Sequence, residues 1–502
     1  MIADPKPDGV RSWTEGTGAN KIYHVGTLKY TPAALAMLFF WLLWGDFCYT
    51  VMEAVTGPIM QLKLKALEAS NMEIVIILSS LPTLLYSFLN PIISFRSDRF
   101  RSRWGRRIPF ILGSLPFLVM FLVALGFGDR IAFWLHGHVS YLTANYSANQ
   151  VAIVTLGGLL ILFTFFNTFV TSTFWYLFND VVPEHLLARF MAVFRTIGTL
   201  SGAMYNFYIF PYSGTHSTEI FVCAALLYLT GFGLMCYNVR EPAYPPAPPY
   251  VGGKTGTLPA ILTYAKQTHA FPHYWYLWLC TFIGGIGGGA AVIGGGTFGL
   301  YFFQTIGLSL QQIGNMNGYL QLTVSVLTLG AGWLADRYHP IRVVVLGTFL
   351  GMVLVTPANL IWLFWTPSPQ MAYWVALFIV IGLHAPAASL GGMWDPPMIM
   401  RLFPRSHYGQ FCSINAVWRS IGGVVGGLMV AAYLEYLTPI VGKDRAYFYL
   451  PLWSMAFSIP SFLLLFGLYR SWKKHGGDEA YLAPVLQSAV NPVPSAVQPI
   501  VQ

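Results

Sequence analysis

Two carboxylic acids lie within the first long apolar run of the chain, residues 33–57. Asp46 and Glu53 are seven residues apart, a spacing that places both on one face of an α-helix. An ionised carboxylate at membrane depth costs about 3 kcal/mol, so two on one stripe should face water or a partner group. We predict that this pair binds a proton or Na⁺; a protonated or hydrogen-bonded structural pair is the alternative. Candidates for substrate contact in the same run are Phe39, Tyr49 and Thr50.

A second set of polar side chains follows one face of the apolar run at residues 151–179. It combines hydroxyl and amide groups with an aromatic ring, and sugars require such hydrogen bonds together with flat apolar contact. The set comprises Thr164, Asn167, Thr168, Thr171 and Trp175. In the run at 312–335, Asn317 and Gln321 share a face and would complete the hydrogen bonds of a sugar. Hydrogen bonding between neighbouring helices explains these polar groups equally well.

The stretch SFRSDRFRSRWGRRIPF, residues 94–110, holds six arginines and one aspartate between two apolar runs. Its simplest role is topological, because arginine-rich loops stay on the cytoplasmic side. Asp98 is nevertheless followed directly by an arginine, and the same pair recurs near residue 336. Such pairs near helix ends can be exchanged between conformations. We predict a gating role for Asp98, Arg99, Arg106, Arg107, Asp336 and Arg337.

Two further arginines lie inside apolar runs, where an unpaired guanidinium is costly. Arg195 and Arg419 occupy matching places one to two turns inside their runs. We predict that Asp180 neutralises Arg195 and that Asp395 neutralises Arg419. These pairs would act either as gates or as static staples, because buried ion pairs are often neutral for stability. His384, on the face of Asp395, is more often a structural histidine than a proton relay.

The apolar run at residues 274–303 contains nine glycines between Gly284 and Gly299. Glycine destabilises a helix by about 1 kcal/mol relative to alanine, but it permits close helix contact and bending. We predict a helix that bends or breaks beside the site to occlude it, with tight packing as the alternative. The predicted hinge positions are Gly284, Gly288, Gly294, Gly295 and Gly296.

Membrane-spanning helices must position all of these residues. Of the 502 residues, 55% are hydrophobic and only 9% are charged, which lies outside the range of ordinary soluble domains. A helix of about 20 apolar residues crosses the hydrocarbon core of a bilayer. The twelve predicted spans are 33–57, 73–95, 108–128, 151–179, 190–211, 218–239, 274–303, 312–335, 341–365, 371–399, 410–434 and 447–469.

Lysine and arginine are distributed unequally between the two sides of this topology. With the N-terminus inside, the outer loops contain few of the 28 Lys and Arg residues, namely Lys63, Lys65, Arg130, Lys443 and Arg445. Cytoplasmic segments retain the excess of basic residues, so both termini are predicted to be cytoplasmic. The net charge of +9 is explained by this topology and by contact with anionic headgroups, and a nucleic-acid partner is not expected.

The two halves of the chain resemble each other. AVFRTIG at residues 192–198 recurs as AVWRSIG at 416–422, and SFRSDRF at 94–100 corresponds to GWLADRY at 332–338. Repeats related by an axis along the membrane normal are a transporter architecture with the substrate site between them. The predicted divisions are a cytoplasmic N-terminal tail (1–31), an N-terminal six-helix bundle (32–239), a Pro- and Gly-rich cytoplasmic linker (240–272), a C-terminal six-helix bundle (273–470) and a disordered cytoplasmic tail (471–502).

The sequence SDRFRSRWGRRIPF closely resembles the loop signature of the glycoside-pentoside-hexuronide symporters and the related sucrose transporters, within the major facilitator superfamily. Ile108 departs from it, because those families usually carry a third arginine there. NDVVPEHLLARF at 179–190 resembles, more weakly, their loop after the fourth span. Plant sucrose transporters carry a coupling aspartate in that span where Thr164 stands here, which puts their particular proton mechanism in doubt.

The resemblance implies an all-α integral membrane protein with the major facilitator fold. Twelve transmembrane helices would form two pseudo-symmetric six-helix bundles that rock around a central sugar site. Asp98 and the arginine loop would latch the inner face while the outside is open.

The expected function is secondary active symport of a sugar or glycoside with H⁺ or Na⁺ by alternating access. No Ser/His/Asp arrangement, GxxxxGK[ST] loop or HExxH motif is visible, so an enzyme is not expected. Uniport and transport of another small polar solute, such as a nucleoside, are alternatives, and a transport-dead receptor is disfavoured by the coupling acids. No cofactor or metal site is expected. We expect the protein to lie in the plasma membrane, specifically a bacterial inner membrane, and to act as a monomer.

Overall fold

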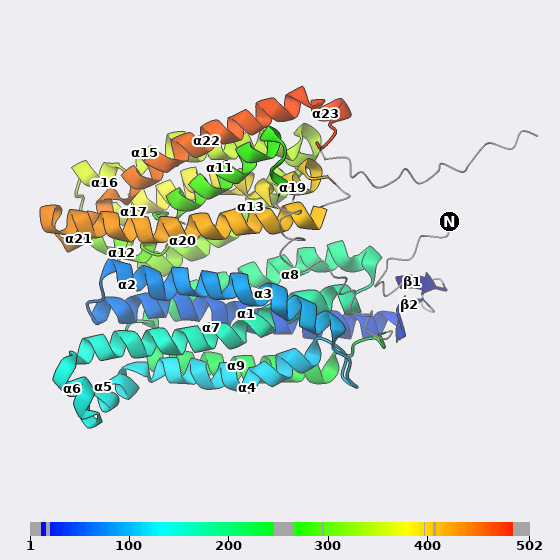
Figure 1. The fold of residues 1–502 in the computed structure, drawn as a ribbon, viewed down its shortest axis with the longest axis horizontal. Helices are drawn as coiled ribbons and strands as arrows, with labels where there is room; N and C mark the ends of the chain where they lie inside the picture. Colours follow the sequence, from blue (N-terminus) through cyan, green and yellow to red (C-terminus); the bar gives the residue numbers. More distant parts are fainter. Residues whose placement is uncertain are drawn as a thin grey trace, which may run out of the picture.

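The computed structural model of the chain describes residues 12–16, 21–244, 266, 268–293, 296–395, 397–404 and 408–484. Its helices form two bundles that lie side by side, with most helix axes along the long dimension of the molecule (Figure 1). The N-terminal half of the chain builds one bundle and the C-terminal half builds the other.

The long helices of the N-terminal bundle coincide with the first six predicted spans. They are α1 (Pro32–Ala66), the run of α2 (Asn71–Val75), η2 (Ile76–Ser80) and α3 (Leu81–Arg99), α4 (Ile108–Gly126), α7 (Ala148–Val181), the run of α8 (Glu184–Met204), η3 (Tyr205–Ile209) and η4 (Phe210–Tyr212), and α9 (Ser217–Asn238). Two short helices, α5 (Gly128–His138) and α6 (Ser140–Asn145), connect α4 to α7.

The C-terminal bundle is more interrupted. Its elements are α11 (Pro272–Gly288), α12 (Gly299–Thr305), α13 (Leu310–Tyr338), α14 (Pro340–Leu350), η5 (Gly351–Val355), α15 (Thr356–Ala358), α16 (Ile361–Phe364), α17 (Pro369–Leu377), η6 (Phe378–His384), α18 (Ala385–Gly391), η7 (Gly392–Trp394), α19 (Pro397–Leu402), α20 (Tyr408–Val441), α21 (Lys443–Ala446), η9 (Tyr447–Tyr449), α22 (Leu450–Lys474) and α23 (Gly477–Ala480). The boundary that we predicted at residue 470 therefore falls inside α22, because the amphipathic end of that helix packs onto the bundle.

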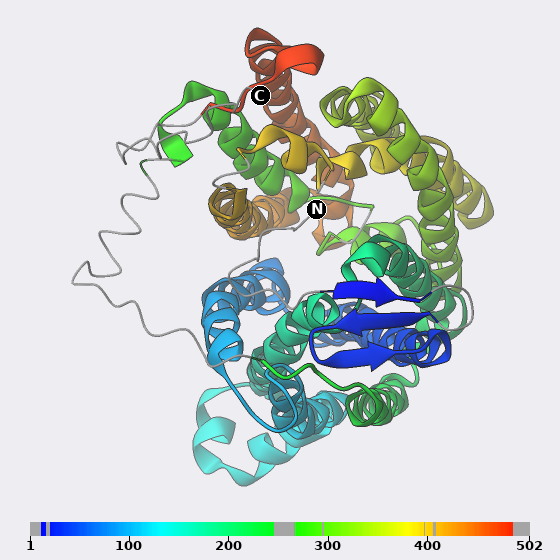
Figure 2. The ribbon, with the colours of Figure 1, turned by 90° about the vertical axis from the view of Figure 1, so that its right-hand side faces the viewer.

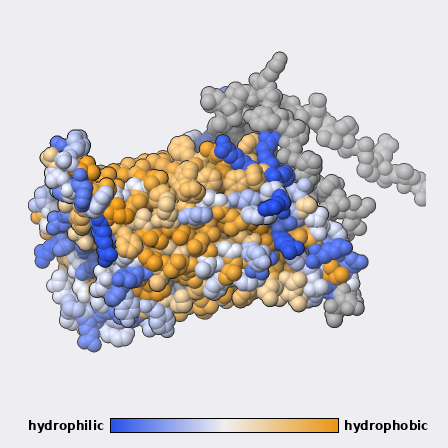
Figure 3. Space-filling model, turned by 90° about the horizontal axis from the view of Figure 1, so that it is seen from below, coloured by the Kyte–Doolittle hydropathy of each residue, from blue (hydrophilic) through white to orange (hydrophobic). Residues whose placement is uncertain are grey.

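The surface between the two ends of the molecule is apolar. Figure 3 shows a broad hydrophobic belt flanked by hydrophilic residues, and large side chains exposed in the spans include Phe88, Val154 and Leu329. Such a belt requires a non-aqueous surrounding. Ten helical segments of the described chain are long and apolar enough to cross a membrane. The other two predicted spans correspond to α8 with η3 and to α11, both packed within the bundles, so the count is compatible with twelve.

The two bundles are joined by hydrogen bonds at the end opposite to the arginine-rich loop. Lys65 Nζ donates to Gln304 Oε1 at 3.0 Å, and the Tyr301 hydroxyl donates to the Gln61 carbonyl at 2.6 Å. The Tyr447 hydroxyl also reaches Asn71 Oδ1 at 3.0 Å. Gln61 and Lys65 lie near the end of α1 and Asn71 begins α2, so these bonds hold the C-terminal bundle against one end of the N-terminal bundle.

A small antiparallel sheet lies at the arginine-loop end and was not predicted. Strands β1 (Ser12–Glu15), β2 (Ile22–Val25) and β3 (Leu28–Tyr30) pair in that order and cover the end of the N-terminal bundle (Figure 2). The Tyr23 ring stacks on His185 of α8 at 5.7 Å, and the Thr27 hydroxyl accepts a hydrogen bond from the Ala243 backbone at 2.8 Å. The sheet therefore ties the N-terminal tail to the segment that leaves α9.

The segments that leave the two bundles form a further internal repeat. EPAY at residues 241–244 follows α9, and DEAY at 478–481 follows α22. Glu241 binds the loop before α4, whereas Asp478 forms an ion pair with Arg342 of α14, the corresponding helix of the other half. The Tyr481 hydroxyl donates to the Leu402 carbonyl at 2.9 Å. In each bundle, an acidic residue in the segment after the last long helix thus binds at or near the start of the third helix.

Helices α11 and α20 cross at a pair of Gly-xxx-Gly sequences. A Cβ atom at Gly285 would lie 2.9 Å from the carbonyl carbon of Gly422, and one at Gly289 would lie 2.9 Å from that of Gly426. Backbones approach this closely only where both surfaces lack side chains. The close crossing explains two of the nine glycines in the α11 region by packing alone.

Substitution at this crossing should destabilise the protein. A Cβ at Gly426 would lie 2.4 Å from the Cα of Ile286, so Gly426→Ala should lower the free energy of unfolding by about 1–3 kcal/mol. At Gly423, on the same helix, a Cβ meets nothing within 4 Å, so Gly423→Ala should be neutral or stabilising through helix propensity. Thermal unfolding of the two purified variants compares them, and equal midpoints would refute the packing role.

Candidate functional site

A cavity of about 770 Å³ lies between the two bundles. Helices α1, α7 and α8 with η3 line it from the N-terminal half, and α13, η6 and α18 line it from the C-terminal half. Its polar and aromatic lining residues are Asp46, Tyr49, Thr50, Glu53, Trp175, Phe194, Arg195, Thr199, Tyr205, Asn206, Asn317, Gln321, Ser325 and His384. We call it the central cavity.

Both predicted coupling acids face the central cavity from α1, but their surroundings differ. Asp46 is only 2% exposed, and its Oδ2 atom has no hydrogen-bond partner in the described part of the chain. Arg195 is the cation that attracts its charge. Glu53 accepts a hydrogen bond from Asn167 Nδ2 at 2.6 Å and lies beside the Tyr49 phenol. One acid thus keeps a vacant oxygen, whereas the other is held by neutral donors.

Helix α8 passes close to the Asp46 carboxylate at Gly198. A Cβ atom at Gly198 would lie 3.4 Å from Asp46 Oδ2 and 3.5 Å from the Thr50 hydroxyl oxygen. The absence of a side chain at Gly198 therefore leaves room beside this carboxylate. An oxygen with an open position and a nearby cation is suited to bind a proton or a small cation that competes with arginine.

The structure divides the predicted substrate residues into three groups. The side chains that line the central cavity are Tyr49, Thr50, Trp175, Asn317 and Gln321. Asn167 and Thr171 lie one shell further out: the Thr171 hydroxyl reaches the Tyr49 hydroxyl at 3.4 Å, as Asn167 reaches Glu53. Side chains of α1 therefore cover the middle of α7 and separate these two residues from the cavity.

Three other predicted substrate residues are not among the described residues that line the central cavity. The Thr164 and Thr168 hydroxyls donate to the carbonyls of Leu160 and Thr164, both at 2.7 Å. The Phe39 ring packs against Phe190 at a centroid distance of 4.9 Å. Helical spacing placed the threonines on one face correctly, but it did not indicate what covers that face.

Sequence reasoning missed the contribution of the fifth span to the cavity. Thr199 and Asn206 line the cavity together with Arg195 and Gly202. These four residues recur at intervals of three and four, which is the signature of a single helical face. Asn206 is buried in the π-helical segment η3, where its Nδ2 atom donates to the Gly202 carbonyl at 2.8 Å. A polar stripe in an apolar run was thus the available signal.

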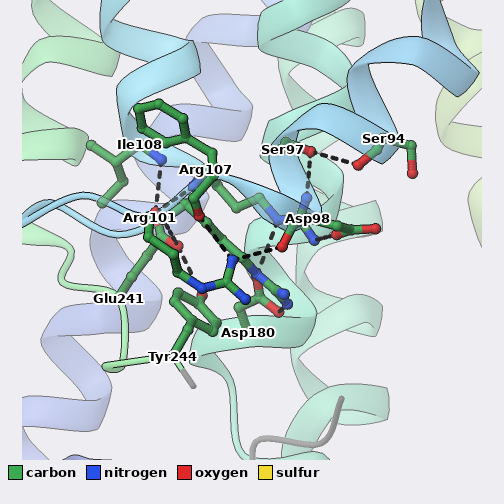
Figure 4. Close-up of polar contacts among 11 residues, drawn as sticks. Ser94, Ser97, Asp98, Arg101, Arg107, Ile108, Asp180, Glu241 and Tyr244 are labelled. Atoms are coloured by element: carbon green, nitrogen blue, oxygen red, sulfur yellow. Dashed lines mark hydrogen bonds and ion pairs between the residues drawn. The ribbon is translucent and has the colours of Figure 1, made fainter. Parts of the chain in front are cut away.

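Asp180 is the centre of an ion-pair network in the arginine-rich loop (Figure 4). Arg106 binds it through two nitrogen atoms, at 3.0 and 2.6 Å, and Arg107 Nε lies 3.1 Å from it. Arg107 also bonds to Ser97 and Asp98 of α3. The network connects the ends of α3, α4 and α7 within one bundle.

The predicted pairing of Asp180 with Arg195 is wrong. Asp180 lies in the last turn of α7, next to the arginines of the loop before α4. Arg195 lies three turns into α8 and faces the central cavity. The guanidinium of Arg195 instead lies 5.8 Å from the centroid of the Trp175 ring. Proximity across the short α7–α8 turn did not translate into contact because the two helices run away from that turn.

Glu241 completes the loop network and was not predicted. Its carboxylate accepts hydrogen bonds from the backbone N–H groups of residues 106, 107 and 108 at 2.9, 2.8 and 2.7 Å. These are the orphan donors at the start of α4, so Glu241 acts as its N-terminal cap from a distant segment. A Cβ atom at Gly105 would lie 2.3 Å from the Glu241 carboxyl carbon, and Gly105 has a φ of +103°. Only glycine fits this position.

Tyr244 covers the same network. Its hydroxyl donates to Glu241 Oε2 at 2.8 Å, and the Arg106 guanidinium lies 4.2 Å from its ring centroid. Burial, followed by the charges of Asp180 and Glu241, raises the pKa of the Tyr244 phenol above its ordinary value. The phenol thus stays protonated and keeps donating to the carboxylate.

The corresponding residues of the C-terminal half also pair within their own bundle. Asp336 binds Arg401 at 3.0 Å, while the Arg337 guanidinium lies 5.4 Å from the Trp333 ring. Arg419 forms the expected ion pair with Asp395. In the other half, the Arg99 guanidinium lies 4.8 Å from the Phe95 ring.

The predicted hinge coincides with a break in the helix. Helix α11 ends at Gly288 and α12 begins at Gly299, while Gly294 and Gly295 lie outside the described residues. A Cβ atom at Gly296 would lie 1.8 Å from the Ala291 carbonyl oxygen, so the chain folds back on itself there. Gly284 lies inside α11. Whether the break moves during function stays a prediction.

Comparison with known proteins identifies the family of the chain. Residues 66–470 match the family of MFS/sugar transport proteins. The chain belongs to this family. Its predicted membership of the major facilitator superfamily is therefore confirmed, and the family identifies a transporter rather than an enzyme, as predicted.

Solved structures support the fold of this transporter. A bacterial homologue of the human lysosomal transporter Spinster, inward-facing and occupied, matches with a TM-score of 0.61 and 14% identity over 89% of this chain and 99% of that one. A D-xylose-proton symporter gives 0.57 and 14% over 84% and 96%. The nucleoside transporter NupG gives 0.55 and 12% over 87% and 99%. The predicted major facilitator fold is confirmed.

The loop network makes the two aspartates unequal. Asp180 is 5% exposed and neutralises two buried arginines, so Asp180→Asn in this transporter should lower the free energy of unfolding by about 3 kcal/mol. The Asp98 side chain is 52% exposed, so Asp98→Asn should cost about 0–1 kcal/mol. Denaturation of both purified variants measures the difference. A cost at Asp98 equal to that at Asp180 would contradict the assignment of Asp180 as the centre.

Proposed function

We propose that this transporter is a symporter that carries a sugar or glycoside together with H⁺ or Na⁺ by alternating access of the central cavity. The observation that carries the proposal is the pair of acids, Asp46 and Glu53, on one face of α1 in a polar cavity between two bundles. Carboxylates inside a membrane-spanning helix are costly unless they bind a cation or a proton.

The lining of the central cavity supports a polyhydroxylated substrate. Hydroxyl and amide groups from both halves face it, among them Thr50, Asn206, Asn317 and Gln321, and Trp175 adds an aromatic ring. Sugars bind where such hydrogen-bonding groups converge around a flat apolar surface. Since donors come from both bundles, a bound sugar would link them and bias their relative position.

The ion pairs of the two bundles would act as gates. Those described at the arginine-loop end, around Asp180 and around Asp336 and Asp395, each join groups of one half, whereas the hydrogen bonds of Lys65 and Tyr447 join the two halves at the opposite end. Rocking would break the latter and bring Asp98 and the arginines against the C-terminal bundle. We place the protein in the bacterial inner membrane as a monomer with cytoplasmic termini, because the arginine loop then lies inside.

A gradient experiment tests the function directly. Purified protein in proteoliposomes should accumulate a radiolabelled sugar or glycoside when an inward H⁺ or Na⁺ gradient is imposed. Uptake that ignores both gradients would identify a uniporter, and accumulation of labelled uridine instead of any sugar would identify a nucleoside carrier. Absence of uptake for every solute would favour a receptor.

Removing the charge of either coupling acid should uncouple transport. Asp46→Asn or Glu53→Gln should lower gradient-driven accumulation by tenfold or more, because the ion or proton can no longer bind. Substrate exchange across the membrane should persist, because the cavity stays intact. Glu219→Gln, at an exposed acid of α9 outside the central cavity, serves as the control and should accumulate like the wild type. Wild-type accumulation by both cavity variants would contradict the assignment of Asp46 and Glu53 as coupling residues.

A further inference from the structure

A second cavity, of about 340 Å³, lies inside the C-terminal bundle. It is lined by α11, by α14 with η5 and α15, by α18 and by α22. We call it the side chamber. Residues that line it include Gly284, Gly288, Gly351, Ala387, Gly391 and Ser458.

The side chamber exists because its walls lack side chains. Cβ atoms at Gly288, Gly351 and Gly391 would meet no atom within 4 Å. In the N-terminal bundle the interior is filled by large rings: Phe174 and Phe232 are fully buried with their centroids 5.1 Å apart. In the C-terminal bundle the space of the side chamber is instead left open by glycine.

The side chamber offers an apolar surface even where its walls carry polar residues. The Ser454 and Ser461 hydroxyls donate to the carbonyls of Ala290 and Cys280, both at 3.2 Å. Asn359 Nδ2 donates to the Val355 carbonyl at 2.9 Å. No Asp, Glu, Lys or Arg is found among the described residues that line it. Because these donors are already engaged, the chamber suits an apolar group rather than a second sugar ring.

The side chamber adjoins the central cavity. His384, at the end of η6, and Ala388, in α18, line both spaces. A ligand in the central cavity therefore has a polar space on one side of these residues and an apolar space on the other. A volume of about 150 Å³ holds a benzene-sized molecule, so the chamber accommodates a phenyl or branched alkyl group with room to spare.

We propose that the side chamber binds the apolar part of an amphiphilic substrate, a glycoside with an aryl or branched alkyl aglycone, while the sugar hydroxyls bind in the central cavity. This inference rests on the proposed transport function and names its substrate class. His384, which lines both cavities, would contact the substrate at the glycosidic link between the sugar and the aglycone.

Matched pairs of glycosides test the substrate class. Purified protein in nanodiscs should bind phenyl β-D-glucoside, galactoside or xyloside about tenfold or more tightly than the methyl counterpart, because a buried ring adds apolar contact. Gly288→Val and Gly391→Val, which fill the chamber, should remove this preference. Gly158→Val is the control, since Gly158 is exposed on α7, meets nothing within 4 Å and lines neither cavity. Equal binding of phenyl and methyl members, or a preference that survives both filling variants, would overturn the proposal.

A sugar-free arm separates failure of the chamber from failure of the transport function. In a cysteine-free background, benzyl methanethiosulfonate should modify Gly391→Cys, and prior reaction of Thr199→Cys in the central cavity with a bulky sulfonated reagent should slow that modification severalfold. Labelling of Gly158→Cys should be unaffected by the same block. If the block leaves Gly391→Cys labelling unchanged, the chamber does not open to the central cavity and the proposal fails. If the block works but no glycoside of any pair binds, the sugar assignment fails instead.

Discussion

The cost of a carboxylate inside an apolar helix is the constraint on which the arrangement of this transporter depends. Asp46 and Glu53 lie in α1, whose buried residues are mostly apolar. Such acids are tolerated where a polar cavity reaches them, and the central cavity between the two bundles supplies it. Glycine at position 198 leaves space beside Asp46, because a Cβ atom there would already lie in van der Waals contact with the Oδ2 atom, at 3.4 Å. The shape of the cavity thus follows from the need to keep two acids reachable.

A cavity between two bundles is useful only if each bundle holds its own shape. The N-terminal bundle satisfies its loop charges internally: Asp180 neutralises Arg106 and Arg107, and Glu241 returns from the end of α9 to cap α4. The C-terminal bundle repeats the device with Asp478 and Arg342. The buried pairs of Asp180 add little net stability, but breaking one is costly, so they favour a rigid bundle over continuous deformation, whereas the pair of Asp478 and Arg342 is partly exposed. Hydrogen bonds between the bundles gather at the end opposite to the arginine-rich loop, and a further one joins Ser87 of α3 to Ser420 of α20.

How far the sequence predicted this arrangement depended on the kind of signal. Acids and arginines inside apolar runs are rare enough that Asp46, Glu53 and Arg195 were found at once, and all three line the cavity. Helical periodicity specified which threonines share a face but not that Tyr49 and Glu53 cover it. The partner of Asp180 was misassigned because nearness in sequence says little about residues on two helices that diverge. Glu241 was overlooked because a Pro-rich segment was interpreted as a connector with no contacts.

The glycines of α11 show why a single composition signal can have two causes. Gly285 and Gly289 face α20 and allow the backbones to touch, whereas Gly284 and Gly288, one position earlier, line the side chamber. A shift of one residue rotates a side chain by about 100° around a helix, so the same run serves two surfaces. The first pair fixes α11 against α20, which makes that helix a stable wall and not a freely bending one. Because α11 ends at Gly288, the predicted hinge would lie beyond that residue, at the junction with α12 and beside the chamber.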